Sequence, residues 1–346
     1  MRKLLITIAL ILSCTVSASA MEFTAPPAPE SAEPYLPSTT TSFSADLWYV
    51  LKTAVAKIQP DIAEAVGVCI SLVSVVLLLS LLQGFIGTTQ RIVQLAGTIA
   101  ITLLLVRPSN SLIKLGVSTI EEISEYGKLL IPVMTAALAA QGGTASSAAL
   151  YSGTVLFDSF LTMLISKLLV PMIYIYIVLI AAHSAIGEDT LKNLRTFIKW
   201  LMSWCLKIPI YLFTGYMGIT GVVSGSTNAA ALKAAKLAIS GCVPIVGNII
   251  SDASEAVLVS AGVMKSAVGT YGLIAMLAVY VGPFLRIGIH YILLKLTAAV
   301  TGTFGCKQCV SLIDDFSGIM GFLLAMTGSV CLFLLISTVC FMKGVS

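Results

Sequence analysis

Long apolar runs, separated by short polar stretches, follow one another along most of the chain. A helix of about 20 predominantly apolar residues is long enough to cross the hydrocarbon core of a bilayer. The runs that we expect to cross a membrane cover residues 66–86, 92–106, 168–186, 201–223, 271–284, 287–304 and 316–342. The pattern predicts an all-α, polytopic transmembrane helical protein with about seven to nine membrane segments.

Two stretches between these runs predict re-entrant or broken helices. Residues 107–128 mix charged and apolar positions, so we expect a helix along the membrane surface. Residues 129–140 are too short to cross, and we pair them with residues 145–165 as a hairpin that dips into the membrane or crosses it twice. Asp158 in the second arm is a candidate functional residue, although a carboxylate hydrogen-bonded between packed helices is the commoner case.

The N-terminal end has the three parts of a secretory signal in residues 1–20: basic residues, an apolar run and small residues up to Ala20. We predict cleavage after Ala20, with an uncleaved first helix as the alternative. Residues 21–46 are rich in Pro, Ser and Thr, which is typical of an exported tether without ordered structure. Residues 47–346 then form the polytopic membrane domain, which begins with an amphipathic helix.

Basic residues set the predicted orientation. Lys192, Arg195, Lys199 and Lys207 form the clearest basic group beside apolar runs, and such groups stay in the cytoplasm. Counting crossings from this loop places the N-terminus outside, Arg286 at the inner end of a helix, and the C-terminus in the cytoplasm.

Composition supports the membrane assignment and argues against one class of partner, nucleic acid. Hydrophobic residues make up 58% of the 346 residues and charged residues 10%, against about 25% charged in soluble domains. The net charge of +4 comes from scattered residues rather than a basic block, so nucleic acid is not an expected partner.

Residues 240–272 are more polar than the spans around them. Asn248, Asp252 and Glu255 fall at i, i+4 and i+7 on one side of a helix, and Lys265 follows them. We call these four residues the polar seam. Its three charges would add roughly 8 to 10 kcal/mol if they faced lipid, so we expect them to face water, protein or a cavity.

Pro244 and Gly247 precede the polar seam and Gly269 follows it, so we expect a break or re-entrant bend before the helix. Three interpretations of this segment stay open. It is a surface helix with a solvated face, a lining that gates a path or docks a partner, or an ion-coupled transport site.

The other candidate residues carry weaker signals. Cys306 and Cys309 form a C-x-x-C on the side predicted to be exported, where a local disulfide, free thiols or a redox site all fit. Asp314 and Asp315 are typical of a helix N-cap. Glycines that suit close helix packing, either within one subunit or in a homo-oligomer, are Gly215, Gly218, Gly221 and Gly225.

Catalytic and metal-binding motifs are absent from the sequence. The chain has two histidines, His183 and His290, with no partner at ligand spacing, and it contains no H-E-x-x-H, Walker A or G-x-S-x-G motif. We therefore expect no catalytic residue, no metal and no cofactor.

Several motifs resemble those of one sporulation family. Val-Pro-Ile-Val-Gly at 243–247, Ser-Asp-Ala-Ser-Glu at 251–255 and Lys-Ser-Ala-Val-Gly at 265–269 are similar to the signature of the stage III sporulation protein AE family of endospore-forming bacteria. Residues 131–146 and 232–236 resemble two further segments of that family. The resemblance runs from about Leu47 to the C-terminus, with Asn248 standing where we expect a second glycine.

This resemblance implies a non-enzymatic, multi-pass subunit of the sporulation channel that connects mother cell and forespore and is required for forespore development. The implied location is the mother-cell-derived membrane around the engulfed forespore. The implied partners are the other stage III sporulation A proteins, including their ATPase, and stage II sporulation protein Q across the intermembrane space, together with membrane lipid. A stand-alone secondary transporter and, less favoured, a membrane thiol oxidoreductase are the alternatives.

Overall fold

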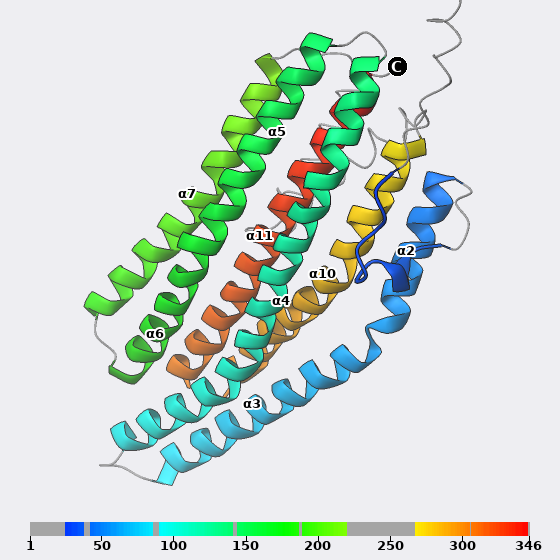
Figure 1. Ribbon diagram of the computed structural model, residues 1–346. Coiled ribbons are helices and arrows are strands. Elements are labelled where there is room, and N and C mark those ends of the chain that lie inside the picture. Colours follow the sequence, from blue (N-terminus) through cyan, green and yellow to red (C-terminus); the bar gives the residue numbers. More distant parts are fainter. Residues whose placement is uncertain are drawn as a thin grey trace, which may run out of the picture.

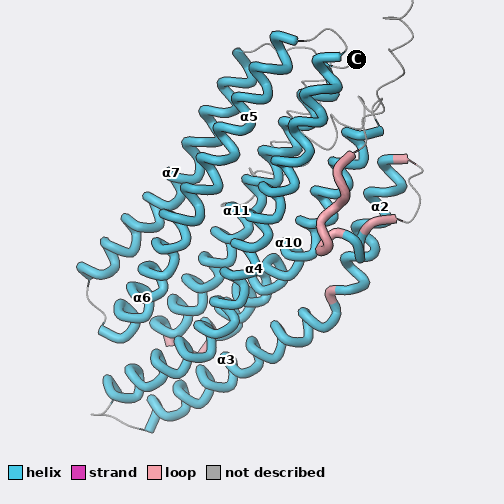
Figure 2. Tube along the Cα trace, viewed as in Figure 1, coloured by secondary structure: helices cyan, strands magenta, loops and turns pink. Residues whose placement is uncertain are grey.

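A computed structural model of the chain describes residues 25–37, 42–85, 90–140, 144–186, 189–219, 267–304 and 306–344. These residues form helices joined by short connections, with no strand among them (Figure 2). The elements are η1 (Glu33–Tyr35), α2 (Phe43–Lys57), α3 (Gln59–Phe85), α4 (Gln90–Ala140), α5 (Thr144–Leu164), the π-helical turn η2 (Ile165–Leu169), α6 (Val170–Ile186), α7 (Asp189–Ile219), α10 (Ala267–Gly302) and α11 (Lys307–Gly344).

The prediction of an all-α, polytopic membrane fold is confirmed. In the described part of the chain, five helices are long and apolar enough to cross a membrane. They cover Gln59–Gln83, Ile92–Ala139, Ser147–Ala185, Val268–Gly302 and Lys307–Met342. α7, which includes the described part of the predicted span at 201–223, is not among the five.

Segments that we separated in the sequence join into longer helices. Residues 92–140 form one helix, α4, so the predicted surface helix at 107–128 is wrong, and α5, η2 and α6 run on without a break through the predicted hairpin arm. α10 likewise continues through Pro283 and Arg286. Proline is tolerated inside membrane helices because neighbouring helices and local adjustments satisfy the freed backbone groups. Pro108 lies inside α4, which changes direction between its part beside α3 and its part beside α11 (Figure 1).

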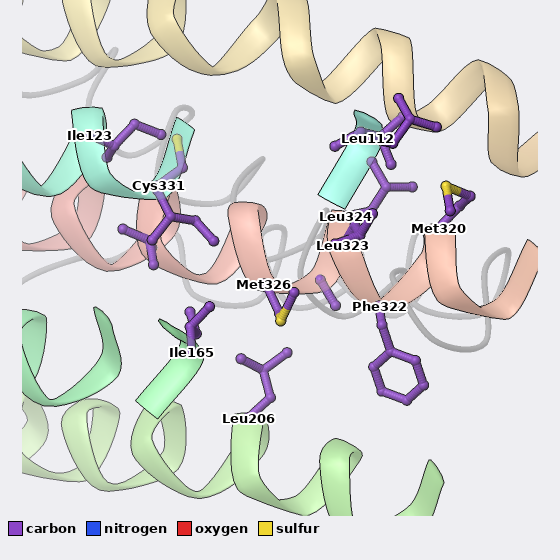
Figure 3. Close-up of a cluster of buried hydrophobic side chains, with 14 of the residues drawn as sticks. Leu112, Ile123, Ile165, Leu206, Met320, Phe322, Leu323, Leu324, Met326 and Cys331 are labelled. Carbon is purple, nitrogen blue, oxygen red and sulfur yellow. The ribbon is translucent and has the colours of Figure 1, made fainter. Parts of the chain in front are cut away.

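The most enclosed helix is α11, which contacts α10 and α4 most extensively and also α5, α6 and α7. In the apolar stretch of α11, 94% of the residues are buried inside the protein, against 22% in that of α3. Figure 3 shows Leu112 and Ile123 of α4 on one side of α11 and Ile165 and Leu206 on the other. α11 therefore serves as the core of the bundle, whereas the exposed apolar side chains of α3 are suited to lipid.

The N-terminal stretch at 25–37 packs on the bundle, contrary to the expectation of an unordered tether. Ala32 is fully buried, and the Tyr35 hydroxyl lies 2.8 Å from the position that a Cβ on Gly282 of α10 would occupy. The Ser42 side chain accepts a hydrogen bond from the backbone of Ala45, which caps α2. A few well-placed side chains thus fix a stretch whose composition predicts disorder.

The predicted orientation needs correction. α7 and α11 begin at the same end of the bundle (Figure 1), and Arg195 of α7 forms an ion pair with Asp315 of α11. The basic loop before α7 and Cys306 therefore lie on one side, so the prediction of a cytoplasmic loop with an exported Cys306 is wrong. The error arose at Arg286, which lies inside the continuous α10 rather than at a helix end.

Candidate functional site: buried polar groups between the helices

Charged and hydrogen-bonding side chains join the described helices at several places, among them the contacts of Asp315, Asp158 and Arg286. Such groups are costly in a membrane unless they pair, and they mark candidate functional positions. The first site connects α6, α7 and α11, the second connects α4 and α5, and the third connects α3 and α10.

The first site is centred on Asp315 of α11, whose side chain is 10% exposed. One carboxylate oxygen pairs with the Arg195 guanidinium of α7, and the other accepts a hydrogen bond of 3.2 Å from the Tyr176 hydroxyl of α6. Arg195 also donates to the Ser311 hydroxyl at 3.4 Å. Three helices are thereby held together by one carboxylate, which suits fixing their relative positions.

The neighbouring carboxylate, Asp314, forms an ion pair with Lys295 of α10, and both side chains are about half exposed. The predicted N-cap role of Asp314 and Asp315 is wrong, because α11 begins at Lys307, about two turns earlier. These two adjacent acids instead connect α11 to two different helices, α10 and α7.

The second site is the hydrogen bond from the Ser124 hydroxyl of α4 to Asp158 Oδ2 of α5, at 2.6 Å. Asp158 is 3% exposed, and its Oδ1 has no hydrogen-bond partner among the described residues. Thr154 and Thr162, one turn before and after Asp158, have side-chain oxygens in the same situation. The sequence signal at Asp158 therefore corresponds to a hydrogen-bonded carboxylate between packed helices, with an additional polar row along α5.

The third site joins Arg286 of α10 to two acids of α3. The distance from Arg286 Nε to Asp61 Oδ1 is 3.1 Å, and that from Nη2 to Glu64 Oε2 is 3.4 Å. Asp61 and Glu64 stand one turn apart, so both reach the same guanidinium. Together these contacts hold the beginning of α3 against the middle of α10.

Most of the residues predicted as functional fall outside the described ranges. These are Ala20, Gly221, Gly225, Pro244, Gly247, Asn248, Asp252, Glu255 and Lys265. Their predicted roles stay predictions.

The glycines that the structure does describe differ in their surroundings. A Cβ on Gly269 would lie 2.6 Å from Met342 Cγ and 3.1 Å from Met134 Cε, so close packing uses this glycine. A Cβ on Gly215 would meet no atom within 4 Å, and Gly218 belongs to the same helix, α7. Within the described part of α7, Gly215 is thus not at a tight helix contact.

Cys306 and Cys309 are joined as a disulfide in the structure, with their Cα atoms 5.5 Å apart. Both are buried, at 4% and 1% exposure, immediately before and within the first turn of α11. Burial limits the access that thiol exchange requires, so the arrangement suits a structural bond better than a redox site.

The described residues contain no group of three or more His, Cys, Asp or Glu side chains that could hold a metal ion. His290 lies in α10 with its Nδ1 2.9 Å from the backbone oxygen of Arg286 in the preceding turn. This contact within one helix gives the buried imidazole ring a hydrogen-bond partner.

Sequence reasoning missed the partners of Arg195 and Arg286. The charges themselves were visible, and Asp61 and Glu64 have a spacing that places them on one helix face. Pairing them across helices, however, requires knowing which helices are neighbours. A useful signal would have been that an isolated acid in one apolar helix and an isolated base in another, at the same expected depth in the membrane, tend to pair.

A helical bundle with five candidate spans, joined internally by ion pairs, defines a polytopic membrane protein. The family model "Stage III sporulation protein AE" matches residues 35–344, and the chain therefore belongs to this sporulation family, which confirms the resemblance of its motifs. Stage III sporulation protein AE of Bacillus subtilis (strain 168) is 22% identical over 198 residues, which cover 57% of this chain and 50% of that relative. The chain thus aligns with about half the length of this curated relative. No solved structure matches the chain.

Proposed function

We propose that this protein is a non-enzymatic membrane subunit of the sporulation channel that connects mother cell and forespore. Family membership supports a role in sporulation, and the five candidate spans support a place in a membrane. The proposed location is the mother-cell-derived membrane that surrounds the forespore. The proposed partners are the other stage III sporulation A proteins with their ATPase, and stage II sporulation protein Q.

One observation carries the choice of a subunit over a stand-alone transporter. The axis of the bundle is filled by α11, whose side chains are buried against helices on several sides (Figure 3). A transport path through the described helices would have to displace this core, and packed interiors tolerate such changes poorly. A path formed with other chains, or between copies of this one, requires no such displacement.

The polar seam remains the proposed gate or docking face of this subunit. Its test is the double substitution Asp252→Ala with Glu255→Ala, measured by the yield of heat-resistant spores. A matched control replaces Glu121 and Glu125, two exposed acids of α4, by alanine. Normal spore yield from the seam variant would remove the seam from the proposal.

The subunit proposal itself is tested by recovering the full chain through a C-terminal tag from gently solubilised sporulating cells. Stoichiometric recovery of other stage III sporulation A proteins is the expected result. A discrete homo-oligomer that carries no other sporulation protein would contradict the proposal and favour the transporter. A tagged polytopic protein of unrelated function, expressed at the same level, controls for membrane proteins that co-purify nonspecifically.

A further inference from the structure

A cavity of about 320 Å³ lies between the N-terminal stretch at 25–37 and helices α2, α3, α4 and α10. Its volume is at the lower end of the range for small-molecule sites, about 300 to 1,000 Å³. Four charged side chains of both signs line it: Lys57, Asp61, Glu122 and Arg286. The type of ligand that fits therefore depends on which of these charges are already paired.

The two cations of the wall already have partners. Lys57 Nζ donates to the backbone oxygen of Pro34 at 3.2 Å and lies 5.1 Å from the centre of the Tyr35 ring. Arg286 pairs with Asp61 and with Glu64, both on α3, and of these two acids only Asp61 lines the cavity. Arg286 is thus neutralised by its two acids, whereas Lys57 keeps its positive charge and is held against the N-terminal stretch by a carbonyl oxygen and a ring.

The residues of α4 that line the cavity offer hydrogen-bond acceptors. The hydroxyls of Ser118 and Thr119 donate their hydrogens to the backbone oxygen of Leu115, at 3.0 and 2.7 Å, which leaves oxygen lone pairs available. Glu122 follows Ser118 by one turn and makes no ion pair or hydrogen bond with any described residue. The unused chemistry of the cavity is therefore one carboxylate beside two acceptor oxygens.

Tyr35 lines the cavity from the N-terminal stretch. Burial, and secondarily the negative charge of Asp61, raise the pKa of Tyr35 above its ordinary value, so its phenol stays neutral. The phenol thus adds no charge that would oppose a cation.

We propose that this cavity binds a primary ammonium group, held by Glu122 and the hydroxyl oxygens of Ser118 and Thr119. An ammonium has three donors and no acceptor, which matches one carboxylate and two hydroxyl oxygens on a single helix. The group belongs either to the headgroup of phosphatidylethanolamine or to a free small amine. This inference concerns a ligand and does not depend on the proposed channel role.

The test uses the purified full chain in detergent and native mass spectrometry with three probes: short-chain phosphatidylethanolamine, short-chain phosphatidylglycerol and ethanolamine. Glu122→Gln keeps the shape of the side chain and removes its charge. Glu125→Gln is the matched control, because Glu125 is an exposed acid on the same helix and does not line the cavity.

We expect phosphatidylethanolamine to bind the wild type in preference to phosphatidylglycerol. Glu122→Gln should weaken this binding by roughly tenfold to a hundredfold, because the amide oxygen still accepts a hydrogen bond but no longer carries a charge, whereas Glu125→Gln leaves it unchanged. Competition by ethanolamine assigns the site to a free amine, and its absence assigns it to the lipid. Equal binding of the two lipids, or equal affinities of wild type and Glu122→Gln, would overturn the proposal, with thermal unfolding showing that both variants are folded.

Discussion

The two adjacent acids of α11 offer a direct test of how this bundle is held together. Asp315 binds Arg195 and Tyr176, and the side chains of the Asp315–Arg195 ion pair are only 10% and 16% exposed, respectively. The side chains of Asp314 and Lys295 are 48% and 45% exposed. Removing one partner of a buried ion pair costs 3 to 5 kcal/mol, so Asp315→Asn should destabilise the protein by about 3 kcal/mol. The same substitution at Asp314 should cost about 0 to 1 kcal/mol, since exposed pairs contribute little.

Unfolding can be followed by the reaction of the buried thiol Cys331 with a maleimide dye as the full chain in detergent is heated, after the more accessible thiols, Cys69 and Cys205 among them, have been blocked. The two asparagine variants change the same chemical group at neighbouring positions, so each controls for the other. Similar unfolding temperatures for the two would refute the reasoning from burial. A third variant, Arg195→Gln with Asp315→Asn, should recover part of the loss, because no unpaired charge remains in the bundle.

Three further substitutions test other contacts. Gly282→Ala should displace Tyr35 and cost about 1 to 3 kcal/mol by overpacking, and limited proteolysis should then cut the N-terminal stretch faster. Ser124→Ala removes the donor to Asp158 and should cost about 1 to 3 kcal/mol in thermal unfolding. Cys306→Ser removes a disulfide that closes a very short loop and should lower the free energy of unfolding by about 2 kcal/mol. The unfolding temperature of this variant should no longer change when reductant is added.

Each of these has a matched control on the same or a neighbouring element. Gly288→Ala in α10 adds a methyl group where no atom lies within 4 Å, so it should leave the N-terminal stretch protected. Ser118→Ala removes a hydroxyl that donates only to its own helix and should change stability by less than Ser124→Ala. Cys205→Ser replaces a free, half-buried thiol and should preserve the response to reductant. A variant that behaves like its control would contradict the contact assigned to it.

The membrane class was predictable because apolar runs and scarce charges are properties of the sequence itself. The division into helices was less predictable, since Pro283 and the charges at 107–128 suggest breaks that the surrounding helices make unnecessary. Asp158 stood out because a carboxylate in an apolar run is rare. The partner of Asp315, by contrast, lies on a helix more than a hundred residues earlier, and only the packing of α7 on the bundle brings Arg195 to it.

The enclosure of α11 bears on how the protein is assembled in the membrane. A helix whose neighbours cover nearly all of its surface is the C-terminal one among those described, so the ribosome delivers the centre of the bundle after its walls. Until then, the faces of α4, α5 and α10 that pack against α11 lack this partner, so lipid or an insertion factor must cover them. Nascent chains stalled before Lys307 should consequently be held in a loose, protease-sensitive state, and maturation should depend on the release of this last helix into the membrane.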